Sequence, residues 1–105
     1  MNARDAQEPE NTIKAIQEAV AQMFGLAVEE LSKESGPRDV AAARHIAMFL
    51  SDEMTDASAS EIGRYFGGRQ SSRVGYAIAR IQELRSREPK LDHTLSKLRK
   101  TLNDR

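Results

Sequence analysis

Residues 58–73 of this chain read Ser58-Ala59-Ser60-Glu61-Ile62-Gly63-Arg64-Tyr65-Phe66-Gly67-Gly68-Arg69-Gln70-Ser71-Ser72-Arg73, and they predict two helices joined by a turn. Ser58 and Glu61 have the S-x-x-E spacing of a capping box, in which a hydroxyl and a carboxylate satisfy free amides at a helix start. We expect a short helix over 59–66, a turn at Gly67-Gly68 and a long helix from about Gln70 to residue 87. Two helices joined by a short glycine-containing turn are typical of a helix-turn-helix.

Apolar residues at helical spacing extend this interpretation to both sides of the segment. We expect a first helix capped by Thr12 and stopped at Gly25, a short helix over 28–31, and a long helix that follows Ser35-Gly36-Pro37. A last helix begins near Leu91. No stretch predicts a strand, so the expected fold class is all-α: a compact bundle of about six helices containing a helix-turn-helix.

Length and composition predict one globular domain. The 105 residues suit a single domain of roughly 100–200 residues, and 39% hydrophobic with 30% charged residues is typical of a globular chain. We expect a disordered tail over 1–11 and the domain over 12–105. The absence of cysteine excludes disulfides and thiolate metal sites. No apolar run approaches the roughly 18 residues of a membrane span, so we expect a cytoplasmic protein.

Charge is unevenly distributed although the formal net charge is zero. Residues 1–36 hold three bases against seven acids, whereas residues 37–105 hold thirteen bases against nine acids. Residues 62–82 contain no acid but four arginines: Arg64, Arg69, Arg73 and Arg80. A locally basic stretch of this kind is the electrostatic footprint of a phosphate-binding surface, although a solvated helix face also produces it.

The sequence offers little support for catalysis. It lacks the G-x-x-x-x-G-K-[ST] loop, so no nucleotide site is expected. His45 and His93 have no metal-ligand spacing, and Ser71 and Ser72 have no neighbouring base that would activate a nucleophile. We therefore expect no enzyme, no metal and no cofactor.

The start of the second helix of the motif carries side chains suited to DNA. Gln70 can pair bidentately with adenine and Arg73 with guanine, while Ser71 and Ser72 can contact bases or phosphates. Gly75 lowers helix propensity by about 1 kcal/mol relative to alanine unless a close backbone approach compensates. Polar residues at a helix start are also ordinary capping, so these residues alone favour DNA binding only modestly over a helical interaction module.

From about Ile13 to Leu102 the chain resembles the C-terminal DNA-binding domain (domain IV) of the bacterial replication initiator DnaA. The residues that carry the resemblance are Ala43-Arg44-His45-Ile46-Ala47-Met48 and Ser58-x-x-Glu61-Ile62-Gly63-x-x-Phe66-Gly67-Gly68-Arg69. The resemblance implies the Trp repressor-like helix-turn-helix fold of that domain, without the nucleotide-binding portion of a full initiator.

The resemblance also implies a set of DNA-contacting residues. The family follows its FGGR string with Asp-His-[Ser/Thr]-Thr-Val, whose side chains read its DNA boxes in the major groove. Arg69 is kept here, but the next four positions hold Gln70, Ser71, Ser72 and Arg73. The family's minor-groove arginine and a further basic position correspond to Arg38 and Arg44, and Ser58 opens the motif.

Two functions are compatible with this pattern of kept and replaced residues. The first is binding of double-stranded DNA, with specificity altered from the usual box, by a cytoplasmic, nucleoid-associated bacterial regulator of replication initiation or transcription. The alternative is a DnaA-like paralogue that regulates initiation by contacting a replication-initiation protein, with little DNA binding of its own. Asp52, where the family often has a phosphate-contacting lysine, favours the alternative.

Overall fold

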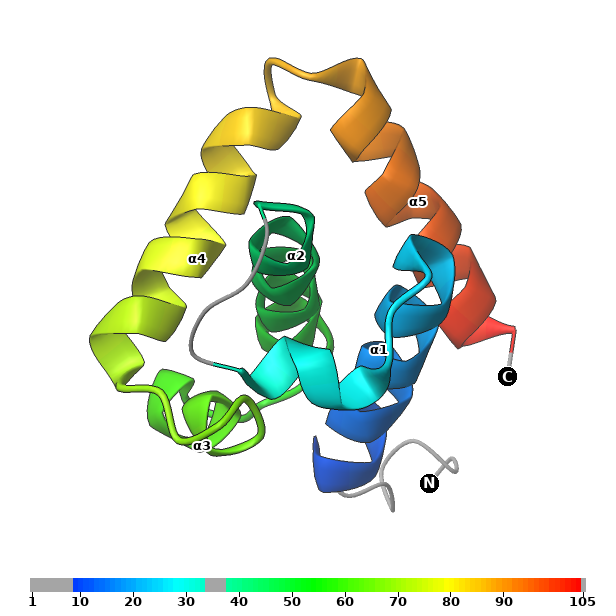
Figure 1. Ribbon diagram of the computed structural model, residues 1–105. Coiled ribbons are helices and arrows are strands. Elements are labelled where there is room, and N and C mark those ends of the chain that lie inside the picture. Colours follow the sequence, from blue (N-terminus) through cyan, green and yellow to red (C-terminus); the bar gives the residue numbers. More distant parts are fainter. Residues whose placement is uncertain (1–8, 34–37, 105) are drawn as a thin grey trace.

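The computed structural model describes residues 9–33 and 38–104 and contains five α-helices and one 3-10 helix in those ranges (Figure 1). No strand occurs in the described residues, which confirms the all-α prediction. The sequence predicts about six helices, and the second of the six described helical elements is a 3-10 helix rather than an α-helix. In chain order the elements are α1 (Pro9–Phe24), η2 (Val28–Ser32), α2 (Arg38–Met54), α3 (Ala59–Arg64), α4 (Ser71–Arg85) and α5 (Pro89–Asn103).

The first helix begins at Pro9, so the prediction that Thr12 caps it was wrong. A proline has the φ that suits the first helical position and has no N–H to leave unpaired, which favours the earlier start. The remainder of the predicted tail, residues 1–8, and the predicted Ser35-Gly36-Pro37 start of the next helix lie outside the described residues. None of the described helices is long and apolar enough to cross a membrane.

One hydrophobic core joins all of the elements, with α2 at its centre (Figure 1). Helix α2 packs against α1 on one side and against α4 on the other. The predicted last-helix leucines Leu95 and Leu98 are buried, because α5 turns back from α4 and packs on α1. The largest fully buried side chains of the core include Ile13, Ile16, Leu31, Met48, Leu50, Ile62, Phe66, Leu95 and Leu98.

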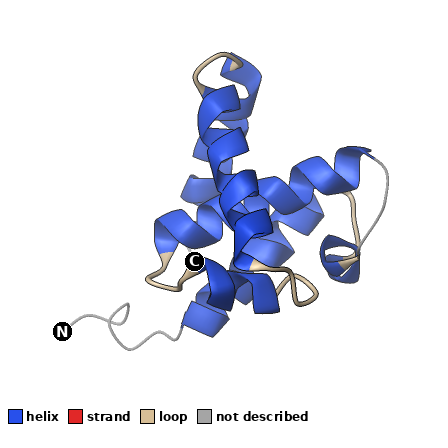
Figure 2. Ribbon diagram, turned by 90° about the vertical axis from the view of Figure 1, so that its left-hand side faces the viewer, coloured by secondary structure: helices blue, strands red, loops and turns tan. Residues whose placement is uncertain are grey.

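Helices α3 and α4 form the predicted helix-turn-helix, and α4 crosses α2 steeply (Figure 2). The capping box at the start of α3 is confirmed, since the Ser58 hydroxyl accepts from the Glu61 amide at 3.1 Å and the Ser58 amide donates to the Glu61 carboxylate at 2.8 Å. At the far end of α2, Arg99 of α5 makes a two-pronged ion pair with Glu53 at 2.6 and 2.8 Å. The ion pair therefore joins α5 to the C-terminal end of α2.

The turn between α3 and α4 depends on glycine at two positions. The carbonyl of Gly63 accepts from the amides of Gly68 and Arg69, both at 3.0 Å, which folds the turn tightly over the end of α3. A Cβ at Gly63 would lie 2.0 Å from the Arg69 carbonyl oxygen, where no side chain fits. Gly67 has a φ of +84°, and a Cβ there would lie 2.3 Å from the Ser32 carbonyl oxygen. The turn is thus pressed against both α3 and the end of η2.

Two single glycine-to-alanine substitutions should change the free energy of unfolding in opposite directions. Gly63→Ala forces the turn apart and should lower the free energy of unfolding by about 2–3 kcal/mol. Gly75→Ala meets no atom within 4 Å and should raise it by about 1 kcal/mol through helix propensity. Urea denaturation followed by circular dichroism measures both. Equal stabilities for the two variants would contradict the close packing of the turn.

Candidate nucleic-acid interface

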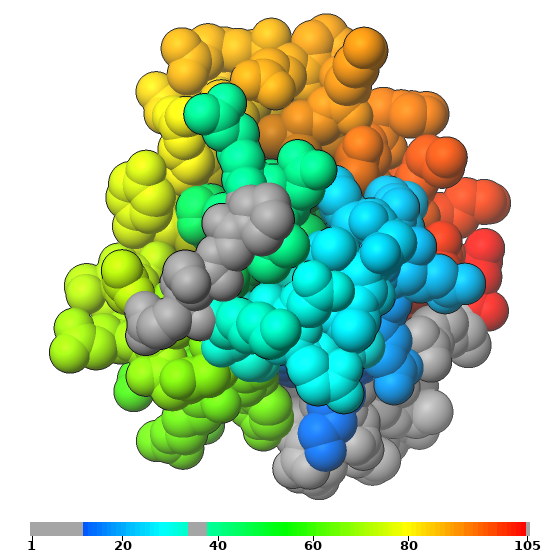
Figure 3. Space-filling model, in the orientation of Figure 1, coloured from blue at the N-terminus to red at the C-terminus, as the bar shows by residue number. Residues whose placement is uncertain are grey.

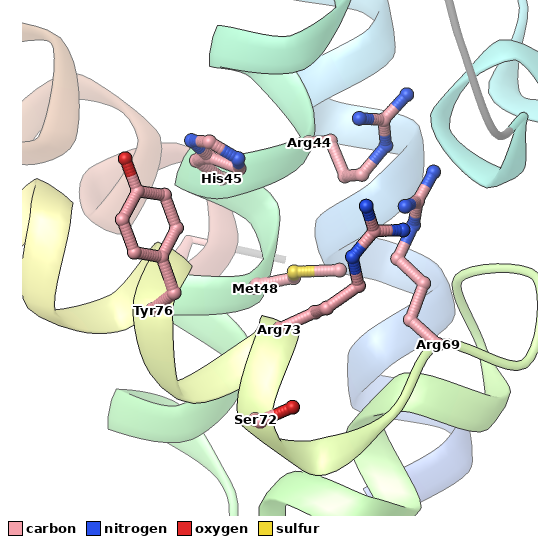
Figure 4. A pocket seen from close by; sticks show the side chains of 7 residues that line it. All are labelled: Arg44, His45, Met48, Arg69, Ser72, Arg73 and Tyr76. Carbon is pink, nitrogen blue, oxygen red and sulfur yellow. The ribbon is translucent and has the colours of Figure 1, made fainter.

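A hollow of about 300 Å³ lies between α2 and the start of α4 (Figure 4). Three guanidinium groups converge on it, one from α2, one from the α3–α4 turn and one from α4. Its described lining consists of Arg44, His45, Met48, Arg69, Ser72, Arg73 and Tyr76. No carboxylate occurs in this described lining, to which three arginines contribute.

Arg44 is buried, with only 6% of its surface exposed. Its Nε donates to the Leu31 carbonyl at 3.0 Å and one Nη donates to the Lys33 carbonyl at 2.8 Å. These bonds supply N–H donors to two carbonyl oxygens at the end of η2. Arg44 therefore joins α2 to η2 and also contributes its charge to the hollow.

Arg69 lies at the end of the turn, half-buried, and donates from one Nη to the same Lys33 carbonyl. Its Nε is buried and has no hydrogen-bond partner among the described residues. A buried donor on a charged group without an acceptor is costly, and a ligand with anionic oxygens is the kind of partner that would relieve it.

The first turns of α4 supply the outer wall of the hollow. Tyr76 follows Ser72 by four residues and Arg73 by three, so the three side chains share one side of the helix. All three are exposed, and Tyr76 is 62% exposed, which is unusual for a large aromatic side chain. In the space-filling view α4 and the α3–α4 turn form one edge of the molecule, where a long partner can reach them (Figure 3).

His45 lies inside the hollow and packs edge-to-face against Tyr76, with ring centroids 6.0 Å apart. Burial of the imidazole lowers the pKa of His45 below its ordinary value. The positive charges of Arg44, Arg69 and Arg80 lower that pKa further, since each disfavours a second cation nearby. His45 is consequently uncharged at neutral pH.

The structure brings together some of the predicted site residues and not others. Arg44, Arg69, Ser72 and Arg73 line the hollow. Gln70 and Ser71 are exposed at the start of α4, where Gln70 is the N-cap residue, and Arg38 is exposed at the start of α2. The hydroxyl of Ser58 is engaged in capping α3.

Sequence reasoning missed three residues of the hollow: His45, Met48 and Tyr76. Tyr76 could have been found, because it follows Ser72 by four residues and so lies one turn further along the same face of α4. No local signal indicated His45, because its neighbours across the hollow come from a helix almost thirty residues away in sequence. Met48 is a core residue whose position predicts only burial.

The arrangement suits an anionic partner better than catalysis or metal binding. No group of three metal-ligating side chains occurs among the described residues. Three guanidiniums in one hollow repel one another, and an anion bound between them would remove that repulsion and accept their hydrogen bonds. A regular polyanion such as nucleic acid is the partner whose charge spacing fits both the hollow and the exposed helix start beside it.

Comparison with known proteins agrees with this assignment. A family model described as "Bacterial dnaA protein helix-turn-helix" matches residues 13–81. The chain is 36% identical over 91 residues to the chromosomal replication initiator protein DnaA of Bordetella pertussis, a match that covers 87% of this chain and 19% of that protein. The DnaA of Burkholderia multivorans is also 36% identical, with 87% and 17% covered. The chain spans about a fifth of the length of these relatives.

Replacement of Arg44 should reveal its role in joining α2 to η2. Arg44→Lys keeps the charge but cannot reach both the Leu31 and Lys33 carbonyls, so the free energy of unfolding should fall by about 2 kcal/mol. Arg64→Lys, on an exposed arginine of α3, should change it by less than about 0.5 kcal/mol. Equal unfolding midpoints in urea for these two variants would show that the carbonyl contacts of Arg44 contribute nothing.

Proposed function

Because this chain belongs to the bacterial DnaA helix-turn-helix family, we propose that it binds double-stranded DNA as a regulator of replication initiation or transcription. The observation that carries the proposal is the convergence of Arg44, Arg69 and Arg73 on one hollow beside the exposed start of α4. The proposal is one of binding alone and includes no substrate-processing chemistry. We place its action on the nucleoid, in the bacterial cytoplasm.

In the proposed complex the start of α4 enters the major groove. Gln70 and Ser71 are exposed at the tip of the helix, where a side chain can reach base edges. The amides of the first turn of α4 add an attraction for a nearby phosphate. Ser72 and Arg73 lie between this tip and the hollow, so they can contact either bases or the backbone.

Arg38 is the proposed minor-groove residue. It precedes His45 by seven residues on α2, so it lies on nearly the same side of the helix, about 10 Å further along its axis. This spacing extends the positive surface from the hollow toward the start of α2. Arginine suits a narrow minor groove because the negative potential there is enhanced.

We further propose that the sequence recognised differs from the usual box of the family. The scaffold that positions the reading helix is intact, since the capping box, the glycine turn and the Arg69 contact are all formed. The side chains at the tip of that scaffold are Gln70, Ser71 and Arg73, whose hydrogen-bonding groups differ from an acid, a histidine and a threonine. Each lost bidentate contact removes about 1–3 kcal/mol of discrimination.

Salt-dependent binding tests the proposal directly. Affinity for a duplex should fall steeply with salt, and Arg73→Ala should weaken binding and reduce the slope of log affinity against log salt by about one. The matched control is Lys97→Ala, which removes one exposed charge from α5, on the other side of the bundle from α3 and the start of α4 (Figure 1). Fluorescence anisotropy at several salt concentrations measures both variants. Equal effects of the two would place the DNA elsewhere.

Selection of bound duplexes from a random library tests the altered specificity. We expect a reproducible motif that is not the usual box and that changes at one or two positions in the Gln70→Ala variant. Recovery of the usual box would contradict altered reading. Failure to bind any duplex at low salt would overturn DNA binding and favour a protein partner, which capture from nuclease-treated extract would then detect.

A further inference from the structure

His45 is the only side chain of the described hollow that titrates near neutral pH, and it lines the hollow together with three arginines. We propose that the hollow receives one backbone phosphate of the duplex and that His45 takes up a proton as it enters, so that DNA affinity rises as the pH falls below neutrality. The inference rests on the proposed function and adds a regulation to it.

The hollow has the size and chemistry that a phosphodiester requires. Its volume of about 300 Å³ is roughly ten times the space of one water molecule, so a phosphate group fits without movement of the backbone. Arg69 brings a buried Nε that has no acceptor among the described residues. Ser72 adds a hydroxyl at the rim, and the side chain of Met48 forms part of the wall (Figure 4).

The charged and titratable groups around His45 come from three parts of the fold. Arg44 lies beside it on α2, Arg69 comes from the α3–α4 turn, and Arg73, Tyr76 and Arg80 come from α4. The carboxylate on that side of α4 is Glu83, which pairs with Arg80 at 3.6 Å and is exposed. Among the described residues, the charged groups that shift the pKa of the imidazole are therefore arginines.

A phosphate in the hollow offsets the arginine charges that help to lower the pKa of His45. The bound phosphate carries a negative charge that compensates the neighbouring guanidiniums and can accept a hydrogen bond from a protonated imidazole. The pKa of His45 thus rises from a lowered value in the free protein to a higher value in the complex. Between these two values the complex holds one more proton than the separated partners, so a lower pH favours binding.

The stability of the free protein should respond to pH in the opposite direction. A histidine whose pKa is lowered by folding makes the folded state bind fewer protons than the unfolded state below about pH 6.5, so stability falls as the pH falls. Acid weakening of the fold would lower DNA affinity. An increase in affinity at low pH therefore cannot come from the fold.

The experiment measures duplex affinity from pH 8.0 to 5.5 at constant ionic strength, using the full chain. The wild type should bind more tightly at the acidic end, by up to about tenfold for each pH unit of this range that lies between the free and the bound pKa. His45→Gln should show no such increase between pH 8.0 and pH 5.5. The chain has one other histidine, His93, which is exposed on α5, so His93→Gln is the matched control and should follow the wild type.

A second measurement reports the proton itself. The ring resonances of His45 and His93 are followed by NMR over the same pH range with and without duplex, and with inorganic phosphate alone. We expect the duplex to raise the pKa of His45 and to leave the ring resonances of His93 where they are without duplex. A rise in the pKa of His45 with inorganic phosphate as well would support the phosphate site independently of DNA reading.

Identical pH profiles for the wild type and His45→Gln, or a His45 pKa that the duplex does not move, would overturn the proposal while leaving DNA binding intact. Absence of binding to any duplex at any pH would instead overturn the proposed function on which it rests.

Discussion

The carbonyl oxygen of Lys33 accepts hydrogen bonds from two arginines that are far apart in sequence, Arg44 of α2 and Arg69 of the α3–α4 turn. Charge-assisted bonds of this kind are stronger than neutral ones, and the bond from Arg44 is partly buried. Together with the Gln17 and Ser32 side chains, which donate to the Tyr65 carbonyl at 2.7 and 3.4 Å, they fix the turn against η2. The position of α4 on the bundle follows from this junction.

The same junction explains why positive charge accumulates where it does. An arginine that donates to backbone carbonyls keeps its full charge, since a carbonyl contributes no compensating negative charge. Arg44 and Arg69 therefore serve the fold and the hollow at once, and Arg73 joins them from α4. Burial lowers the pKa of His45, and the positive charges of Arg44, Arg69 and Arg80 lower it further. The arginines are therefore already in position in the unbound protein, before any polyanion binds.

Local sequence signals predicted most of the helical architecture. The capping box at Ser58 and the Gly67-Gly68 turn place the helix-turn-helix because each depends on neighbouring residues and the backbone alone. The start of α1 was misplaced for a local reason as well, since Pro9 is a better first helical residue than the interpretation of the tail allowed. The 3-10 form of η2 was not predicted, because its five residues support either kind of short helix.

The amino-acid sequence by itself determined the helices, the turn and the residue types at the start of α4, since these depend on spacing over a few residues. Only the tertiary structure decided that Arg44 is buried and bonded to η2, that Tyr76 and His45 belong to the same hollow as Arg73, and that Arg38 and Ser58 lie outside its wall. Those relations arise where α2, η2 and α4 meet. Residues that contact one another there are separated by up to 36 positions along the chain, and no local periodicity reports such a contact.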